Sequence, residues 1–144
     1  MQYYAHSSQG RPMHEWQTFE DHAGRVAERA AKSLRCFGLG GMARVWGLLH
    51  DVGKVTKEFQ VVLAGSPRRF DHSAPGARIA HDRYGRLGKL LAAAIAGHHA
   101  GMADWSALED RLDRAAAPDQ AWEGLVDLPP DPTDLIPFVS GGAG

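Results

Sequence analysis

Apolar residues recur at intervals of three and four along the first forty residues, and this spacing constrains the fold more than any other feature. They are Trp16, Phe19, Ala23, Val26, Ala30, Leu34 and Phe37. The interval matches the turn of an α-helix and places these side chains on one face. Gly38, Gly40 and Gly41 follow, where glycine favours a helix end. The pattern predicts an amphipathic helix with His22 on its buried stripe.

The same periodicity predicts further helices over about residues 42–51, 74–84, 86–99 and 104–117. The helix from 42 breaks near Gly53 and resumes over about residues 57–63. Ser73 stands at the N-cap position of the helix from residue 74, and Pro75 is tolerated in a first turn. No alternating strand pattern of useful length and no internal repeat is present. We therefore expect an all-α fold, a bundle of about five or more helices.

Charge divides the chain into two parts. Residues 1–103 contain 14 Lys and Arg against 8 Asp and Glu, whereas residues 104–144 contain 2 against 9. A basic, arginine-rich face suits a phosphate-bearing ligand, although a solvated mixed surface explains the same balance equally well. Five prolines follow residue 117, and the chain ends in Ser-Gly-Gly-Ala-Gly. We expect a domain core over residues 1–117 and an irregular tail over 118–144 whose end frays.

Composition limits the classes of protein that fit. A chain of 144 residues forms one domain of common size. No apolar run approaches the ~18 residues that a membrane span needs, and no secretory signal is recognisable, so we expect a cytoplasmic protein that does not bind membranes. Cys36 is the only cysteine, which excludes an intrachain disulfide and any metal site with several cysteines. A metal site here would use histidine and carboxylate.

Histidines and one aspartate form the pattern with the clearest chemistry. His50 and Asp51 are adjacent at the end of an apolar helix, about 100° apart around its axis. Either each addresses one of two ions, or the carboxylate bridges both. Further histidines stand at 22, 72, 98 and 99. Imidazoles with a carboxylate suit Mn, Fe, Co, Ni or Zn, and a pair of such ions activates water for phosphodiester hydrolysis.

Each histidine also has a purely structural explanation. His22 on an apolar stripe could be a satisfied core histidine, and His72 could order the turn before Ser73. His98 and His99 could favour a helix C-terminus electrostatically. We interpret His6, His14 and His81 as surface residues or as residues behind the ligands. Gly53 and Lys54 do not form a phosphate loop, because Gly47 is one residue too far upstream and Val55 replaces the required Ser or Thr.

Six short motifs occur in a fixed order along the chain. They are Tyr-Tyr-Ala-His-Ser (3–7), Asp-His (21–22), Leu-Leu-His-Asp-Val-Gly-Lys (48–54), Phe-Gln (59–60), Asp-His-Ser-Ala-Pro-Gly (71–76) and Ala-Gly-His-His-Ala-Gly (96–101). Together they resemble the HD nuclease domain of type I CRISPR interference, over about residues 1–105. The resemblance implies an all-α domain with a two-metal site that cuts single-stranded DNA. It also implies two partners, a CRISPR helicase subunit or domain and the guide-bound surveillance complex.

Carried onto this chain, the resemblance implies six metal ligands: His22, His50, Asp51, His72, His98 and His99. The first three would hold one divalent transition-metal ion, and Asp51 would bridge it to a second ion held by the last three. Mn, Fe, Ni and Co are the expected metals. Asp51 and Lys54 would be catalytic, with Lys54 neutralising charge on the scissile phosphate.

One part of the family pattern is missing. The family completes the first ion's site with an aspartate on a later helix, in a segment like Ser-Ala-Leu-x-x-Ala-Asp, and this chain lacks that segment. The only late carboxylates in comparable territory are Asp127, Asp131 and Asp134, in proline-rich surroundings. We therefore expect the first ion to bind more weakly than the second.

Two alternative functions remain open at this stage. One is another HD-superfamily phosphohydrolase that acts on nucleotides or cyclic nucleotides. The other is a truncated, non-catalytic HD module that docks on CRISPR partners, which the missing aspartate favours.

Overall fold

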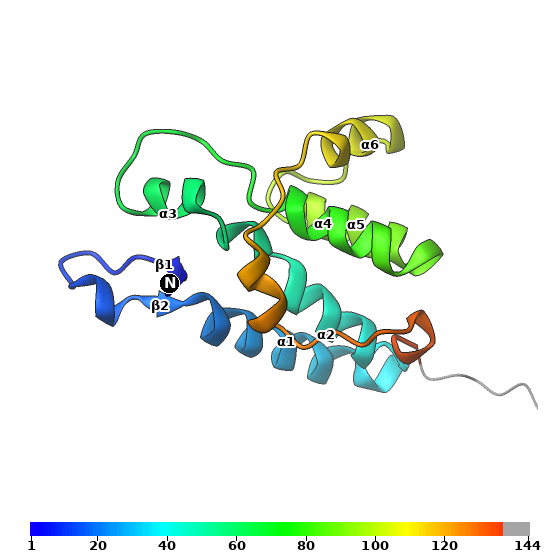
Figure 1. Ribbon diagram of the computed structural model, residues 1–144. Coiled ribbons are helices and arrows are strands. Elements are labelled where there is room, and N and C mark those ends of the chain that lie inside the picture. Colours follow the sequence, from blue (N-terminus) through cyan, green and yellow to red (C-terminus); the bar gives the residue numbers. More distant parts are fainter. Residues whose placement is uncertain (137–144) are drawn as a thin grey trace, which may run out of the picture.

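The computed structural model describes residues 1–136 and confirms an all-α bundle (Figure 1). Its six helices are α1 (Phe19–Leu34), α2 (Gly40–Leu49), α3 (Lys57–Leu63), α4 (Ala74–Arg83), α5 (Gly85–Gly97) and α6 (Trp105–Asp113). Helices α1 and α2 pack as one pair and α4 and α5 as another. None of the helices within residues 1–136 is long and apolar enough to span a membrane.

Helix α1 begins later than the apolar spacing predicts. The Thr18 side chain accepts a hydrogen bond from the Asp21 amide and so caps the helix, which leaves Trp16 outside it. The buried face holds Phe19, Ala23 and Ala27, whereas Leu34 and Phe37 at the far end are exposed. The predicted stripe is therefore buried only in its first half. A 3₁₀ turn over Arg35–Phe37 and Gly38, at φ +71°, end the segment.

Two short strands precede α1, where the sequence shows no strand pattern. β1 (Tyr4–His6) and β2 (Gln17–Thr18) pair antiparallel. Strands of two and three residues are too short for alternation to be recognised, so the sequence did not predict them. Their role is to fix the N-terminal segment against the start of α1, where the Phe19 amide donates to the Tyr3 carbonyl.

Close backbone contact between the end of α2 and the start of α4 depends on two glycines. Helix α2 ends at Leu49, and a 3₁₀ turn over Val52–Lys54 follows. A Cβ atom on Gly53 would lie 2.2 Å from the His72 carbonyl oxygen, and one on Gly76 would lie 1.9 Å from the Leu49 carbonyl oxygen. Only glycine permits this approach, which brings residue 72 to the end of α2.

The N-cap of α4 differs from the prediction. Ser73 occupies the capping position, but its hydroxyl does not cap the helix. Asp71 does so instead, since its Oδ1 accepts hydrogen bonds from the amides of Ser73 and Ala74. Pro75 lies in the first turn, as predicted.

The proline-rich segment after α6 is irregular but packs on the core. Within residues 118–136 it forms only 3₁₀ turns, over Gln120–Gly124 and Pro132–Asp134. Val126 and Leu135 are buried, and the Tyr84 hydroxyl donates to the Pro129 carbonyl. The domain boundary after residue 117 stays a prediction. The expected fraying concerns residues 140–144, which lie outside the described residues.

Candidate metal centre

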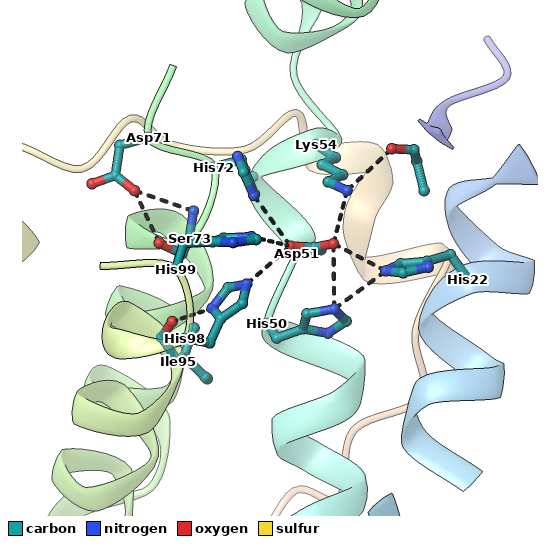
Figure 2. A network of polar contacts seen from close by, with 12 residues as sticks. His22, His50, Asp51, Lys54, Asp71, His72, Ser73, Ile95, His98 and His99 are labelled. Carbon is teal, nitrogen blue, oxygen red and sulfur yellow. Dashed lines mark hydrogen bonds and ion pairs between the residues drawn. The ribbon is translucent and has the colours of Figure 1, made fainter. Parts of the chain in front are cut away.

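Asp51 lies at the middle of a histidine cluster, directly after α2, and its side chain is buried. His22 reaches it from one side, and His72, His98 and His99 reach it from the other (Figure 2). The two carboxylate oxygens therefore face different sets of imidazoles. Four separate segments of the chain supply these side chains, and all six predicted ligands come together.

One oxygen of Asp51 faces the histidines of α1 and α2. Oδ2 lies 3.0 Å from Nε2 of His22 and 3.3 Å from Nε2 of His50, and these two nitrogens are 3.2 Å apart. We call this group the Oδ2 site. His50 is held by the ring of Trp46, which stacks on it with 5.2 Å between ring centroids and 16° between planes.

The other oxygen faces three histidines from the second half of the bundle. Oδ1 lies 3.4 Å from Nε2 of His72, 3.4 Å from Nε2 of His98 and 4.0 Å from Nε2 of His99. We call this group the Oδ1 site. His72 precedes α4, and the pair at 98 and 99 follows the C-terminus of α5.

Hydrogen bonds behind the cluster fix the orientation of two rings. Nδ1 of His50 donates to the Gly47 carbonyl oxygen over 2.7 Å, and Nδ1 of His98 donates to the Ile95 carbonyl oxygen. With the proton on Nδ1, a neutral ring presents the Nε2 lone pair to Asp51. This is the arrangement that prepares histidine as a metal ligand.

The arrangement of unpaired atoms fits a bound cation. Asp51 Oδ1, His72 Nε2 and His98 Nε2 are buried and make no hydrogen bond within the described chain. Lone pairs facing one another need a positive charge between them, which a metal ion or a proton supplies. Two ligands each about 2.1 Å from one ion lie about 3.0–3.4 Å apart, close to the separations of both His72 and His98 from Oδ1.

The electrostatics of the cluster keep Asp51 and His72 in the forms that bind metal. Burial by itself raises the pKa of Asp51, but its contacts with the surrounding histidines outweigh burial and hold that pKa well below the ordinary value. Burial lowers the pKa of His72 to about 4. Metal ligands are deprotonated carboxylates and neutral imidazoles. At neutral pH, therefore, Asp51 is an anion and His72 a neutral ligand.

Lys54 is buried beside the Oδ2 site. Its Nζ lies 2.9 Å from Asp51 Oδ2 and donates to the Ala5 carbonyl oxygen of β1 over 3.1 Å (Figure 2). Lys54 lies one turn after Asp51, as the sequence predicts, but it also joins the centre to the N-terminal strand.

Arg111 on α6 supports the Oδ1 site and was missed by sequence reasoning. Its guanidinium binds both oxygens of Asp71 and donates to the Ser73 hydroxyl, the residues on either side of His72. It also donates to the Ala96 carbonyl oxygen, just before His98. No sequence signal indicates this contact, because Arg111 and Asp71 are 40 residues apart and arginine on a helix is ordinary.

The late carboxylates do not complete the Oδ2 site. Asp131 caps the 3₁₀ turn that follows it, accepting from the Thr133 amide. The Asp134 backbone contacts Gly41, at the opposite end of α2 from His50. Nine residues of helix separate these two positions, or about 14 Å. Within residues 1–136, neither these two aspartates nor Asp127 belongs to a group of potential metal ligands.

A histidine that was not predicted as a ligand lies at the centre instead. Potential ligand atoms of His6, His22 and Asp51 lie within 4.8 Å of one another. His6 belongs to the first of the six motifs, but we interpreted it from the sequence as a surface residue or a residue behind the ligands. Of the other two, His14 is exposed and His81 contacts Asp82, with 3.0 Å between Nδ1 and Oδ1.

Comparison with known families agrees with this geometry. The model of the HD domain family matches residues 19–132, which is most of the chain. The chain belongs to the HD domain family. HD domains are in general metal-dependent phosphohydrolases, and the cluster around Asp51 is a site that could hold the metal. A search of curated proteins finds no match.

Proposed function

We propose that this HD domain is a metal-dependent nuclease that hydrolyses phosphodiester bonds of single-stranded DNA in type I CRISPR interference. The observation that carries the proposal is a buried carboxylate whose two oxygens face separate sets of imidazoles. This is the ligand arrangement expected for two bridged ions. Bound there, divalent Mn, Fe, Ni or Co would activate a water and stabilise the leaving oxygen.

The residues around the ions have distinct proposed roles. Asp51 bridges the two sites and fixes their separation. The ammonium of Lys54, 2.9 Å from Asp51, neutralises negative charge on the scissile phosphate. Trp46 packs against the His50 ring and excludes water from one side of the Oδ2 site.

A groove beside the centre supports a substrate longer than a nucleotide. Its volume is about 570 Å³, and it is lined by Gln17, His22, Arg25, Val26, Arg29, Ala30, Ser33 and Trp46. His22 belongs to both the groove and the Oδ2 site, so the groove leads from the metal centre along α1. Arginine suits phosphate contacts and an aromatic ring suits base stacking. Arg25 and Arg29 are thus placed to bind phosphates next to the one that is cut.

The CRISPR assignment is supported by the ordered motifs, each of which has a place at the centre. Gln60 of the Phe-Gln motif exchanges two hydrogen bonds with the Tyr4 backbone and donates to the Lys54 carbonyl oxygen. Gly76 permits the close approach of α4. We propose a cytoplasmic protein that works with a CRISPR helicase, on the same or another chain, and the guide-bound surveillance complex. The helicase would supply single-stranded substrate.

The test is a nuclease assay on circular single-stranded DNA with Mn²⁺, Ni²⁺, Co²⁺ and Mg²⁺ supplied separately. Cleavage of the circle, with little cleavage of duplex DNA and none by the Asp51→Asn variant, is the expected result. Hydrolysis of nucleotides or cyclic nucleotides but not DNA would identify a different HD phosphohydrolase. No hydrolysis by metal-loaded protein would favour a non-catalytic module, and its binding to the helicase would then be measured.

A further inference from the structure

We propose that His6 is the fourth protein ligand of the Oδ2 site, in the place of the absent late aspartate. The inference rests on the two-ion centre of the proposed function but not on the DNA substrate. His6 lies close to the two groups it would join, since potential ligand atoms of His6, His22 and Asp51 are within 4.8 Å of one another. With His50, the Oδ2 site then has three imidazoles and one carboxylate oxygen.

The ring of His6 is free to bind an ion. Among residues 1–136 it makes no hydrogen bond through either ring nitrogen, and its nearest ring neighbour is His22, at 4.7 Å between centroids and 77° between planes. This edge contact is not a hydrogen bond through a ring nitrogen of His6.

The strand that carries His6 is held at the centre from several directions. Gln60 binds the backbone of Tyr4 through both its amide nitrogen and its oxygen, at 3.0 and 3.1 Å. Lys54 binds the next carbonyl, that of Ala5. The Tyr3 hydroxyl donates to Asp119 Oδ2 over 2.6 Å. These contacts fix the three residues before His6, so the ring lies beside the centre without a helix to position it.

A centre built this way has its own metal preference. An aspartate in this position would give two carboxylates and two imidazoles, whereas His6 gives one carboxylate and three imidazoles. Imidazole favours Ni²⁺, Co²⁺ and Zn²⁺, while carboxylate favours Mg²⁺ and Mn²⁺. The His6 centre should therefore discriminate against Mg²⁺ at the Oδ2 site more strongly than an aspartate-containing centre does.

The test counts Co²⁺ ions bound to the whole chain by calorimetry and by the visible absorption of the bound ion, without substrate. Wild type should bind two equivalents. His6→Ala should bind the first equivalent, at the Oδ1 site, with normal affinity. It should bind the second equivalent, at the Oδ2 site, at least about 10-fold more weakly. His14→Ala removes an exposed histidine and is the matched control, with two equivalents expected. Two equivalents at wild-type affinity in His6→Ala, or only one in wild type, would overturn the proposal.

A second variant distinguishes a ligand from a packing residue. His6→Asp supplies the carboxylate and should restore the second ion with a preference shifted toward Mn²⁺. A merely structural role predicts no rescue and no shift in metal preference, and that result would contradict the assignment. If both ions bind as described but no DNA is cut, the proposed nuclease fails while the His6 site stands.

Discussion

The two oxygens of Asp51 present two unlike sites on one carboxylate. At the Oδ1 site, the oxygen and the Nε2 atoms of His72 and His98 are buried without hydrogen-bond partners. At the Oδ2 site, the Lys54 ammonium already lies 2.9 Å from the oxygen. The Oδ1 site thus lacks a cation that its buried atoms need, whereas an ion at the Oδ2 site binds beside the positive charge of Lys54. A bridging ligand alone does not make two equal sites.

The two sites are also built from different parts of the chain. Arg111 fixes the Oδ1 site by joining α6 to Asp71 and to the end of α5. The Oδ2 site depends on the pair α1 and α2 and on β1, which lies next to the N-terminus. A change in one half should therefore affect one ion more than the other, which makes the comparison testable.

Replacing the shared carboxylate should have the largest effect, because each site uses one of its two oxygens. Asp51→Asn keeps the volume but loses the charge that both ions need. We expect metal content to fall to near zero and phosphodiester hydrolysis to fall by at least about 100-fold, since loss of residues behind metal ligands already costs about 10–100-fold. Metal analysis and an activity assay measure this. A variant with wild-type metal content would show that Asp51 is not the bridge.

Removing the charge at the Oδ2 site should separate binding from catalysis. Lys54→Met retains the buried stem without the ammonium. We expect the hydrolysis rate to fall by roughly 10–100-fold because charge on the phosphate is no longer neutralised. Both ions should stay bound, since the ammonium competes with metal for Oδ2. If Lys54→Met loses bound metal as well as hydrolysis rate, Lys54 acts instead as a structural support of β1.

Weakening the support of the Oδ1 site should affect that ion alone. Arg111→Lys retains the charge but cannot form the two-pronged contact with Asp71. We expect the affinity for Co²⁺ at the Oδ1 site to fall by about 10-fold or more and the affinity at the Oδ2 site to stay unchanged. Arg114→Ala, at the exposed C-cap of α6, is the control. Equal weakening of both ions would mean that Arg111 stabilises the whole fold rather than one site.

In the unmodified protein, the sites should fill unequally. We expect one ion to be retained through purification at the Oδ1 site and the other to require added metal, with affinities at least about 10-fold apart. A titration with Mn²⁺ that follows bound metal and DNA cleavage together measures this, and cleavage should rise only with the second equivalent. Two equivalents retained without added metal would contradict the unequal comparison.

Sequence reasoning predicted what is local and missed what depends on distant contacts. Helix positions followed from periodicity. The six residues that the resemblance implies as ligands lie together around Asp51, and their binding of metal stays a prediction. Arg111 was missed because it acts on Asp71, 40 residues away. The nearness of His6 to Asp51 was missed, although its motif was recognised, because the motif does not show which distant residues the segment contacts. The packing of Leu135 was missed because proline-rich composition indicates irregular structure without excluding burial.

The smallest expected effect concerns the contact that joins β1 to the segment after α6. Tyr3→Phe removes the hydroxyl that donates to Asp119, and we expect the Tm of the metal-free protein to fall by about 2–4 °C at pH 7. This hydrogen bond is the main cause of the lowered pKa of Asp119. The bond therefore contributes stability above pH 3.8, the ordinary value, and loses it as the pH falls through the lower folded-state pKa.

The difference in Tm between Tyr3→Phe and wild type should accordingly stay nearly constant from pH 7 towards 3.8 and shrink as the pH falls below 3.8. Tyr4→Phe is the matched control, because within residues 1–136 the Tyr4 hydroxyl makes no hydrogen bond. If β1 is held by this contact, Tyr3→Phe should also weaken the second Co²⁺ equivalent and leave the first unchanged. If the loss of stability does not depend on pH and both ions bind as in wild type, the Tyr3–Asp119 contact does not hold β1 at the Oδ2 site. That result would contradict the proposed positioning of His6 by this contact.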